Sequence, residues 1–397
     1  MGGRRGEAGR GAVRAGYRDG RVPEGGGGEA AVIRILHAAD LHLDSPFEGL
    51  SEENARMRRQ EQRELLDRIA ELCAENAVQL VLLPGDLFDS DSAYQKTAET
   101  LVLALSRIAA PVFIAPGNHD FFGRGSPYAR LSLPENVRVF KEPKLECFDI
   151  PELSCRVWGA GFNDRYCGEI MRNFAPEKRE GVADILCMHG EVGNPASRYN
   201  PISEAALSRS GMDYAALGHV HTFSGPRRAG DCFYAWPGCA EGRGFDETGE
   251  KGVILADVAP GRAAIRFVPL GGRRYQVLTV TAESSDPAAS VLRQLPEGTE
   301  RDTYRIILTG ELDEVPDLAG LRRVLAGRFF SLQLRDGTSL RRNIWERAKE
   351  DSLRGAFLRR LREMYEAAES ESEKKKITAA ARWGLAAIDG DEEIVGI

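Results

Sequence analysis

The sequence predicts a layered α/β fold that continues into a small second α/β module and a helical C-terminus. Three observations carry this prediction. Over residues 32–217, short apolar runs alternate with stretches of helical periodicity; three apolar runs then follow without helices between them; and beyond Gly271 strands and helices alternate again on a smaller scale. Strand–helix–strand order is typical of folds in which helices cover a sheet.

The first region contains five apolar runs that we expect to form strands. They are residues 32–38, 78–83, 112–115, 182–188 and 214–217. Residues 51–75 and 93–108 lie between the first three runs and carry apolar side chains at a period near 3.6, which predicts two helices. Consecutive strands without intervening helices are then predicted for residues 232–236, 252–258 and 263–269.

The smaller module is predicted to have a β-α-β-α-β order. Its expected elements are residues 275–281, 288–294, 304–309, 318–325 and 329–334. Beyond Thr338 the chain is expected to be helical, with an apolar face formed by Leu353, Phe357, Leu361, Met364 and Tyr365. That face is either a partner-docking stripe or intramolecular packing. The run Lys374-Lys375-Lys376 is expected to be a solvated linker.

Four segments are therefore expected along the chain. They are a disordered Gly/Arg-rich tail over residues 1–31, a main α/β domain over residues 32–271, a small α/β module over residues 272–337 and a helical tail over residues 338–397. The N-terminal tail is expected to be disordered because it has almost no branched apolar side chains whose burial would offset the entropy of ordering.

Composition excludes several classes of protein. The chain has 397 residues, which suggests two or three domains. It has no run of about 18 apolar residues, so no membrane span is expected, and its N-terminus lacks the apolar segment of a secretory signal. Seven cysteines without a C-x-x-C pair argue against a disulfide framework or a zinc ribbon and favour a reducing, cytoplasmic compartment.

The charge balance does not indicate nucleic-acid binding through bulk charge. The net charge is −7, from 53 basic and 60 acidic residues. A polyanionic substrate would therefore have to be held by a local patch or by bound cations.

Five of the six histidines fall in short polar clusters at the ends of predicted strands. The clusters are Asp40-Leu41-His42, Gly85-Asp86-Leu87-Phe88-Asp89, Gly117-Asn118-His119-Asp120, His189-Gly190-Glu191 and Gly218-His219-Val220-His221. Active sites of open α/β sheets collect outside the carboxyl ends of the strands, so these clusters are expected to converge on one rim.

The residue types in these clusters indicate a metal centre. Carboxylates, imidazoles and an amide oxygen suit divalent first-row cations, and the absence of cysteine argues against a structural zinc site. Seven ligand atoms are too many for one tetrahedral ion and suit two ions that share a carboxylate, an arrangement that serves in-line phosphoryl displacement. The D-x-H and G-H-x-H spacings fit as well, because residues i and i+2 of an extended segment point the same way.

The series DLH, GDLFD, GNHD, H and GHVH resembles the five signature blocks of the calcineurin-like metallophosphoesterase superfamily. More narrowly, AADLHLDSPF, PGDLFD and APGNHD resemble SbcD-type DNA-repair nucleases, including YhaO-like bacterial relatives. The resemblance implies a layered α-β-β-α sandwich, in which the small module would be capping-like and the helical tail would bind an ATPase. The resemblance covers roughly residues 33–269. The C-terminal segments match only in their position along the chain and in their predicted order of strands and helices.

The resemblance also implies roles for the motif residues. One metal would be held by Asp40, His42 and His221, the second by Asn118, His189 and His219, and Asp86 would bridge them. His119 would donate a proton or hydrogen bond to the leaving oxygen. Asp120 is included as a catalytic residue because it would either orient His119 or cap the following turn. The implied cofactors are two divalent ions, foremost Mn²⁺, with Mg²⁺ or Fe²⁺ as alternatives.

Three further residues have expected places near these motifs. Asp89 stands where several nuclease relatives carry a histidine that helps place DNA, although other bacterial relatives carry Asp there. Glu191 is either support for the imidazole of His189 or a loop residue. His37 is expected to be a packed strand residue rather than a ligand.

The implied function is a two-metal phosphodiesterase, a DNA exonuclease or endonuclease subunit in DNA end processing and repair. Its expected partners are DNA, an SbcC-type SMC-like ATPase and a second copy of the chain, paired through residues 51–75 and 93–108. The alternative is a metallophosphatase or nucleotide phosphodiesterase of the same fold, although acidic residues after the second motif would repel a phosphate monoester. A catalytically silent scaffold is a third hypothesis, and it is opposed by the full ligand set.

Overall fold

The computed structural model describes residues 31–389, except 91–92, 284–285, 313 and 341–343, and the chain divides into two compact units. The first comprises Met1–Val277, Glu300–Tyr304 and Phe329–Ser331, and the second comprises Leu278–Thr299, Arg305–Arg328 and Leu332–Ile397. The disordered tail expected over residues 1–31 falls almost wholly outside the described residues. None of the described helices is long and apolar enough to cross a membrane.

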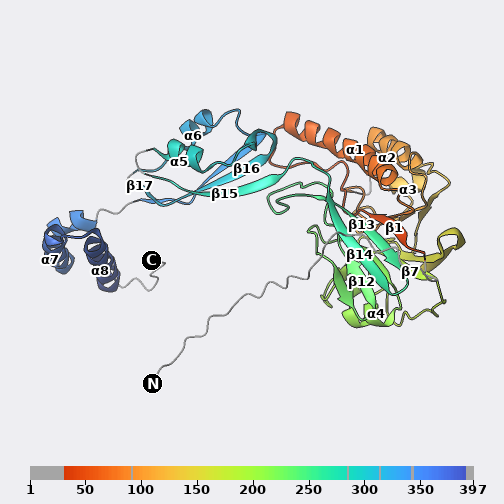
Figure 1. The fold of residues 1–397 in the computed structure, drawn as a ribbon. Helices are drawn as coiled ribbons and strands as arrows, with labels where there is room; N and C mark the ends of the chain where they lie inside the picture. Colours follow the sequence, from red (N-terminus) through yellow and green to blue (C-terminus); the bar gives the residue numbers. More distant parts are fainter. Residues whose placement is uncertain (1–30, 91–92, 284–285, 313, 341–343, 390–397) are drawn as a thin grey trace, which may run out of the picture. The chain divides into compact units, whose positions relative to one another are not determined.

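Two six-stranded sheets form the centre of the first unit (Figure 1). One has the order β14-β13-β1-β2-β3-β4, made of β1 (Ile33–His37), β2 (Leu80–Leu83), β3 (Val112–Ile114), β4 (Val137–Val139), β13 (Gly252–Ala259) and β14 (Arg262–Pro269). The other has the order β11-β12-β10-β7-β6-β5, made of β5 (Glu146–Ile150), β6 (Cys155–Ala160), β7 (Ala183–His189), β10 (Tyr214–Gly218), β11 (Arg227–Ala229) and β12 (Cys232–Ala235).

Helices and a two-stranded pair accompany the two sheets. They are α1 (Glu52–Glu75), α2 (Gln95–Ser106), α3 (Pro127–Arg130), η1 (Pro151–Leu153), α4 (Glu204–Arg209) and a two-stranded pair, β8 (Glu191–Val192) and β9 (Pro201–Ile202). The long helix α1 begins at Ser51, whose side chain accepts a hydrogen bond from the backbone N–H of Asn54.

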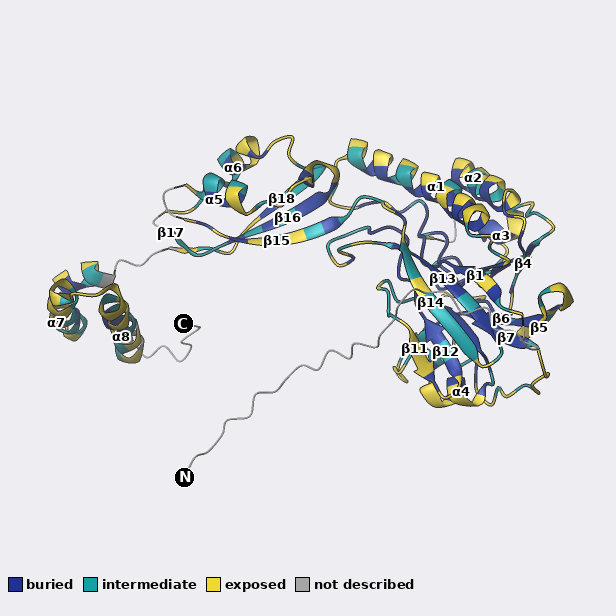
Figure 2. Cartoon of the chain, viewed as in Figure 1, coloured by how far each residue is buried: buried dark blue, intermediate teal, exposed yellow. Residues whose placement is uncertain are grey.

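Burial shows that the two sheets pack face to face. Alternate residues of β1, such as Ile33 and Ile35, share one buried cluster with Ile185 and Tyr214 of the other sheet. The opposite face of the first sheet packs against α1 and α2, and the opposite face of the second packs against α4. Strands covered on both faces are apolar throughout, as in β2, where all four residues are buried. In Figure 2, α1 carries exposed residues along one side and buried residues along the other. The layered α-β-β-α sandwich is thereby confirmed.

Six strands of this unit had no counterpart among the predicted elements. The short strands β8, β9 and β11 are three of them, and the others are β4, β5 and β6, which lie between the third and fourth predicted strands. β4 is only a three-residue Val-Arg-Val segment, and β5 is mostly exposed, so neither has the continuous apolar run of a central strand. β6 is buried but interrupted by Arg156, whose guanidinium is neutralised by Asp184 of the neighbouring strand.

The second unit follows the predicted β-α-β-α-β order closely. Its elements are β15 (Tyr275–Thr281), α5 (Pro287–Gln294), η2 (Thr299–Arg301), β16 (Thr303–Thr309), β17 (Glu311–Leu312), α6 (Leu318–Val324), β18 (Ser331–Asp336) and β19 (Ser339–Leu340), some of which extend into the first unit. Its three-stranded sheet has the order β15-β16-β18, so the strands lie side by side in the order in which they follow along the chain.

The helical tail consists of η3 (Ile344–Lys349), α7 (Leu353–Ala367) and α8 (Glu371–Asp389). The lysine run expected as a linker lies inside α8, so that expectation was wrong. Phe357 and Leu361 pack on a small core around Leu358 and Leu385, whereas Leu353 is 75% exposed. The sequence left two roles open for the apolar face of α7, partner docking or intramolecular packing. The contacts show that this face largely packs within the protein.

Candidate metal centre

The five polar clusters converge, but on a rim that two sheets share. The first three follow β1, β2 and β3 of the first sheet, and the last two follow β7 and β10 of the second. Backbone hydrogen bonds tie the clusters together: His42 N–H donates to the Asp86 carbonyl at 2.9 Å, and His219 N–H donates to the Asp40 carboxylate at 3.0 Å.

The backbone at this rim is strained. Asp40, His42, Asp86 and His219 all have positive φ, at 52°, 43°, 52° and 104°. Non-glycine residues occupy this region at a cost of order 1–3 kcal/mol each, and such residues cluster at functional sites. The strain turns these four side chains into the centre instead of continuing the alternation of the strands. Strained residues of this kind indicate a site where the placement of side chains is kept at a cost in stability.

The first predicted metal position brings together Asp40, His42 and His221. The ligand atoms of these three residues lie within 4.8 Å of one another. Nε2 of His42 and Nε2 of His221 are 3.2 Å apart, and Nε2 of His221 is 3.9 Å from Oδ1 of Asp40. Asp40 and His42 are fully buried, so water does not compete there.

Asp86 lies between the two predicted metal positions. Its Oδ2 is 3.8 Å from Nε2 of His42 on one side and 3.5 Å from Nε2 of His189 on the other. Its Oδ1 accepts a hydrogen bond from the backbone N–H of His119 at 2.9 Å. One oxygen is therefore fixed by the backbone while the other faces imidazoles from both sheets.

The second predicted position contains Asn118, His189 and His219. Oδ1 of Asn118 is 3.0 Å from Nε2 of His189, and the ring of His219 lies 5.1 Å from that of His189. Nδ1 of His189 is 3.0 Å from the carbonyl of Pro84, which is satisfied when Nδ1 carries the proton and Nε2 is free to bind a cation. Gly117 is needed beside this group because a Cβ there would clash with Asp86 and His189.

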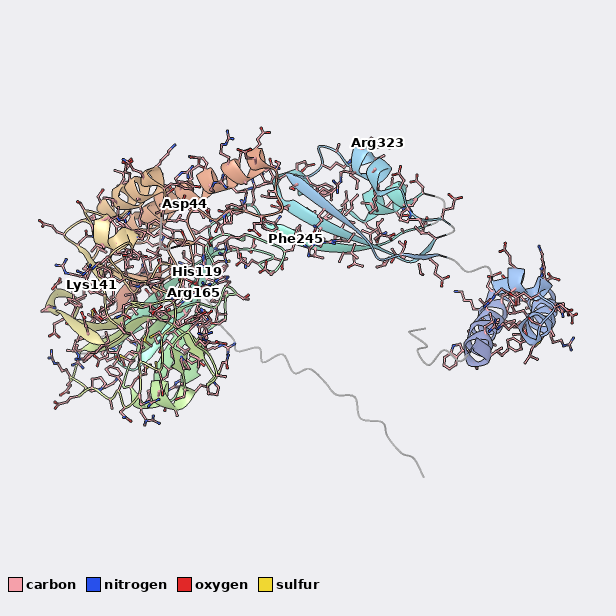
Figure 3. All side chains as sticks on the ribbon, turned by 180° about the vertical axis from the view of Figure 1, so that it is seen from behind. Asp44, His119, Lys141, Arg165, Phe245 and Arg323 are labelled. Atoms are coloured by element: carbon pink, nitrogen blue, oxygen red, sulfur yellow. The ribbon has the colours of Figure 1, made fainter. Side chains whose placement is uncertain are left out.

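His119 lies next to this cluster and is partly exposed. Figure 3 labels His119 among the side chains of the first unit. Its ring is 4.8 Å from the ring of His42 in an edge-to-face contact, and its Nδ1 is 2.9 Å from the carbonyl of Asp89. When Nδ1 of His119 carries a proton, it donates a hydrogen bond to the Asp89 carbonyl. Nε2 is then left to face a substrate. His119 also falls within 4.8 Å of the ligand atoms of His42 and Asp86.

The carboxylate of Asp120 does not orient His119. It is fully buried and accepts hydrogen bonds from the backbone N–H groups of Asp86, Leu87 and Gly117 and from the hydroxyl of Tyr128. None of its described hydrogen bonds reaches His119. The catalytic role predicted for Asp120 therefore has to be corrected to a positioning role, in which its charge joins the two loops that carry Asp86 and Asn118.

Glu191 does not support the imidazole of His189 either. Its described hydrogen bond comes from Asn194, and the Nδ1 of His189 is held by Pro84 instead. His37, in contrast, lies as expected: it is fully buried in β1 with hydrogen bonds to Tyr214 and to the carbonyl of Leu217. Burial lowers the pKa of His37 to about 3, so it stays neutral.

The electrostatics of the centre suit cation binding. Burial lowers the pKa of His42 and of His219 to about 4, so both imidazoles are neutral and can act as ligands. Burial and the charge of Asp86 raise the pKa of Asp40 well above its usual value. The pKa of Asp86 itself falls to about 2, because the three neighbouring histidines outweigh its burial. Divalent cations would relieve the repulsion between these buried carboxylates.

The donor set also fits metal ions geometrically. When Nδ1 of each imidazole donates to an acceptor, the Nε2 lone pairs of His42 and His221 face each other at 3.2 Å. Two lone pairs at that distance repel unless a proton or a cation lies between them. The residues present therefore fit two divalent ions with nitrogen and oxygen ligands, and the structure does not select among Mn²⁺, Mg²⁺ and Fe²⁺.

The sequence prediction missed two residues of the centre. Glu247 and Arg243 lie in the loop between β12 and β13 and contact His221 at 2.6 Å and 3.0 Å. They follow His221 by more than twenty residues without a recognisable spacing, and the only available signal was a charged pair in a glycine-rich loop.

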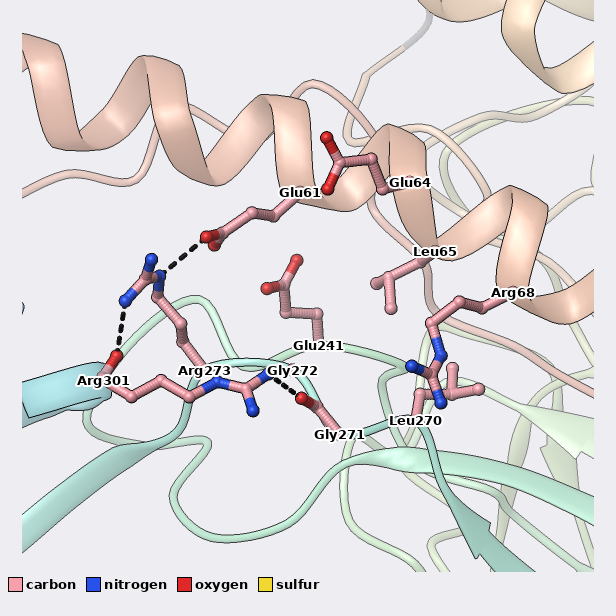
Figure 4. Close-up of a pocket in the computed structure, with 10 residues that line it drawn as sticks. All are labelled: Glu61, Glu64, Leu65, Arg68, Glu241, Leu270, Gly271, Gly272, Arg273 and Arg301. Carbon is pink, nitrogen blue, oxygen red and sulfur yellow. Dashed lines mark hydrogen bonds and ion pairs between the residues drawn. The ribbon is translucent and has the colours of Figure 1, made fainter. Parts of the chain in front are cut away.

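A separate cavity of about 210 Å³ lies between α1 and the loop after β14 (Figure 4). Glu241 faces it, is 2% exposed and makes an ion pair with Arg58. Burial raises the pKa of Glu241 to about 7, against the opposing effect of Arg58. The carboxyl group is therefore close to half protonated at neutral pH.

Glu241 is expected to make stability depend on pH. Because its pKa is raised from 4.5 to about 7 on folding, the contribution of Glu241 to the free energy of unfolding is largest below pH 4.5 and is lost as the pH rises to about 7, a loss of about 3 kcal/mol. The difference between wild type and Glu241→Gln, measured by urea unfolding at pH 5 and pH 8, should show this loss, with Glu64→Gln on the same cavity as the control. Parallel wild-type and Glu241→Gln profiles would contradict it.

Comparisons with known proteins agree with this geometry. Residues 33–223 match the calcineurin-like phosphoesterase family. The metallophosphoesterase YhaO of Bacillus subtilis is 30% identical over 253 residues, which cover 59% of this chain and 60% of YhaO. The SbcD component of the SbcCD nuclease of the same organism is 25% identical over 272 residues, covering 58% of this chain and 68% of SbcD.

The DNA double-strand break repair protein Mre11 of Methanopyrus kandleri is 25% identical over 240 residues, which cover 55% of this chain and 51% of Mre11. The chain thus matches between about half and two thirds of the length of these relatives. The matched family region contains all of the predicted metal ligands and ends just after His221. Residues 33–223 therefore match a calcineurin-like phosphoesterase domain, and the two sheets of that region continue to β14 of this chain.

Proposed function

We propose that this protein is a two-metal phosphodiesterase that cleaves DNA. The observation that carries the proposal is the position of Asp86, whose Oδ2 lies within 4 Å of Nε2 of both His42 and His189. One carboxylate oxygen between two imidazole groups is the arrangement that a bridged pair of cations requires. Two ions bound there would supply Lewis-acid activation of water and neutralise charge on the phosphoryl oxygens.

The residues of the chain then have separate tasks. Asp40, His42 and His221 would hold one ion, Asn118, His189 and His219 the other, and Asp86 both. His119 would give a proton to the leaving oxygen, because its partly exposed ring lies beside that of His42 and its Nδ1 is engaged by the Asp89 carbonyl, which leaves Nε2 for a substrate. Asp120 would keep Asp86 and Asn118 in register through its hydrogen bonds to backbone N–H groups on both loops.

Similarity favours DNA as the substrate. Two of the relatives are named as a nuclease component and a DNA double-strand break repair protein. The acidic overall charge makes bound cations the main means of holding a phosphodiester, which agrees with a site built around them. Manganese as the native metal, a role in DNA repair and a cytoplasmic location belong to this proposal.

A metal-by-substrate panel tests the proposal. With Mn²⁺ present, the purified chain is expected to cleave single-stranded or duplex DNA faster than p-nitrophenyl phosphate, and EDTA should abolish the cleavage. Inactivity on DNA together with rapid release of phosphate from a phosphoserine peptide would overturn the nuclease assignment and indicate a phosphatase.

The helical tail is proposed to bind a partner ATPase, since one relative is named as a single component of the SbcCD nuclease. Leu353 is more exposed than Met364, the other exposed apolar residue described in α7, whereas Phe357 and Leu361 support the packing of α7 on α8. Leu353→Glu is therefore expected to reduce co-purification with an SbcC-type ATPase at least tenfold and to leave folding intact. Phe357→Glu should disturb folding as well. If Leu353→Glu captures the ATPase as well as the wild type does, Leu353 is not part of the interface.

A further inference from the structure

We infer that Glu247, Arg243 and Asp89 form a positioning chain that sets the proton position of both imidazoles at one metal position. This chain would leave Nε2 of His42 and Nε2 of His221 as paired ligands for a single ion. The inference rests on the proposed function, because it concerns the same centre, and it adds Glu247 and Arg243, which the motifs did not include.

Each imidazole meets one carboxylate at its Nδ1. Oε1 of Glu247 lies 2.6 Å from Nδ1 of His221, and Oδ1 of Asp89 lies 3.0 Å from Nδ1 of His42. An ionised carboxylate can only accept a hydrogen bond, so each contact is favourable only when Nδ1 carries the proton. The tautomer with a free Nε2 lone pair follows for both rings.

Arg243 joins the two carboxylates. Its Nη1 donates to Oδ1 of Asp89 at 2.8 Å, and its Nη2 donates to Oε1 of Glu247 at 2.7 Å. Its backbone N–H also donates to Oε2 of Glu247 at 2.8 Å. One guanidinium thus fixes both acceptors at once, and with them the two ring planes.

One contact tests this assignment from within the structure. Nη2 of Arg243 is also 3.0 Å from Nδ1 of His221, where it would donate if that nitrogen were unprotonated. In that case the carboxylate of Glu247 would face a lone pair at 2.6 Å, and Nε2 would direct its proton toward His42. The first arrangement satisfies the carboxylate of Glu247, and an ion bound between the two Nε2 lone pairs would remove their repulsion, so Nδ1 of His221 would carry the proton when the site is filled.

The positioning chain contacts histidines at only one of the two metal positions. At the other, Nδ1 of His189 is held by the backbone carbonyl of Pro84. Glu247 is 4% exposed, and the side chains of Arg243 and Asp89 are about four-fifths buried, so water does not replace these contacts. Loss of the positioning chain should therefore weaken the binding of one ion and leave the binding of the other unchanged.

Manganese titration of the intact protein tests the inference. Glu247→Ala and Asp89→Ala are each expected to weaken one of the two Mn²⁺ ions by about 10- to 100-fold, with the second ion unchanged. The electron paramagnetic resonance signal of a spin-coupled pair should give way to that of a single ion at intermediate Mn²⁺. Glu247→Gln keeps an oxygen acceptor and is expected to recover most of the affinity.

Asp184→Ala is the matched control. Asp184 is fully buried and accepts from Nε of Arg156 at 2.7 Å, but no histidine contacts it in the described hydrogen bonds. It should lower the thermal stability of the metal-free protein without weakening either ion.

Two ions bound with wild-type affinity by Glu247→Ala would overturn the inference, as would equal weakening of both ions in Glu247→Ala and Asp184→Ala. A wild-type protein that binds two ions but cleaves no phosphodiester would refute the proposed function and leave the positioning chain standing. Failure of the wild type to bind a pair of ions would overturn both.

Discussion

Asp86→Ala is expected to lose the metal pair and, with it, phosphodiester cleavage. The variant removes the one oxygen that lies within 4 Å of an imidazole on each side, and it also removes the acceptor for the His119 backbone N–H. Loss of a residue that only supports a ligand typically costs 10- to 100-fold in affinity. Loss of the shared ligand should cost more than about 100-fold for at least one ion.

Metal content and cleavage rate of Asp86→Ala should be measured on the same preparation. Asp86→Asn is the companion variant, since it keeps the side-chain volume and an oxygen acceptor while removing the charge. Both variants are expected to fold, because the Asp120 carboxylate still has backbone donors from Leu87 and Gly117. Wild-type metal content in Asp86→Ala would show that this carboxylate is not a bridge.

His119→Ala is expected to behave in the opposite way. It should keep both metal ions and lose about 10²- to 10⁴-fold in turnover, which is the range that general acid catalysis contributes. The ring is partly exposed and is held by an Nδ1 hydrogen bond to the Asp89 carbonyl and an edge contact with the His42 ring, so its removal leaves the ligand side chains in place.

A substrate with a good leaving group separates this role from a metal-binding role. If His119 protonates the leaving oxygen, the defect of His119→Ala should shrink on a p-nitrophenyl diester, whose leaving group needs no proton. His119 also lies within ligand distance of His42 and Asp86, so a loss of metal in His119→Ala would reassign it as a ligand.

The sequence predicted the layers and the positions of the motif residues because both follow from short-range patterns. The apolar run at β2 and the 3.6-residue period of α1 needed no knowledge of the rest of the chain. The D-x-H and G-H-x-H spacings placed their side chains at strand ends, where the structure brings them together.

What the sequence missed depends on contacts between distant segments. The positive φ of Asp40 and Asp86 cannot be read from residue type, and the partners of Asp120 include a backbone group 33 residues away. Glu247 comes into contact with His221 only because the β12–β13 loop folds back over the centre. The role of Phe357 was left open between docking and packing because the lysine run of its partner helix, α8, was expected to be a linker.

A structure of the protein crystallised with Mn²⁺ and examined by anomalous scattering is the most direct test of the account. Two manganese ions about 3.5–4 Å apart, with a carboxylate oxygen of Asp86 between them, are the result expected for a two-metal phosphodiesterase. A single ion, or a pair that Asp86 does not touch, would contradict the proposed centre.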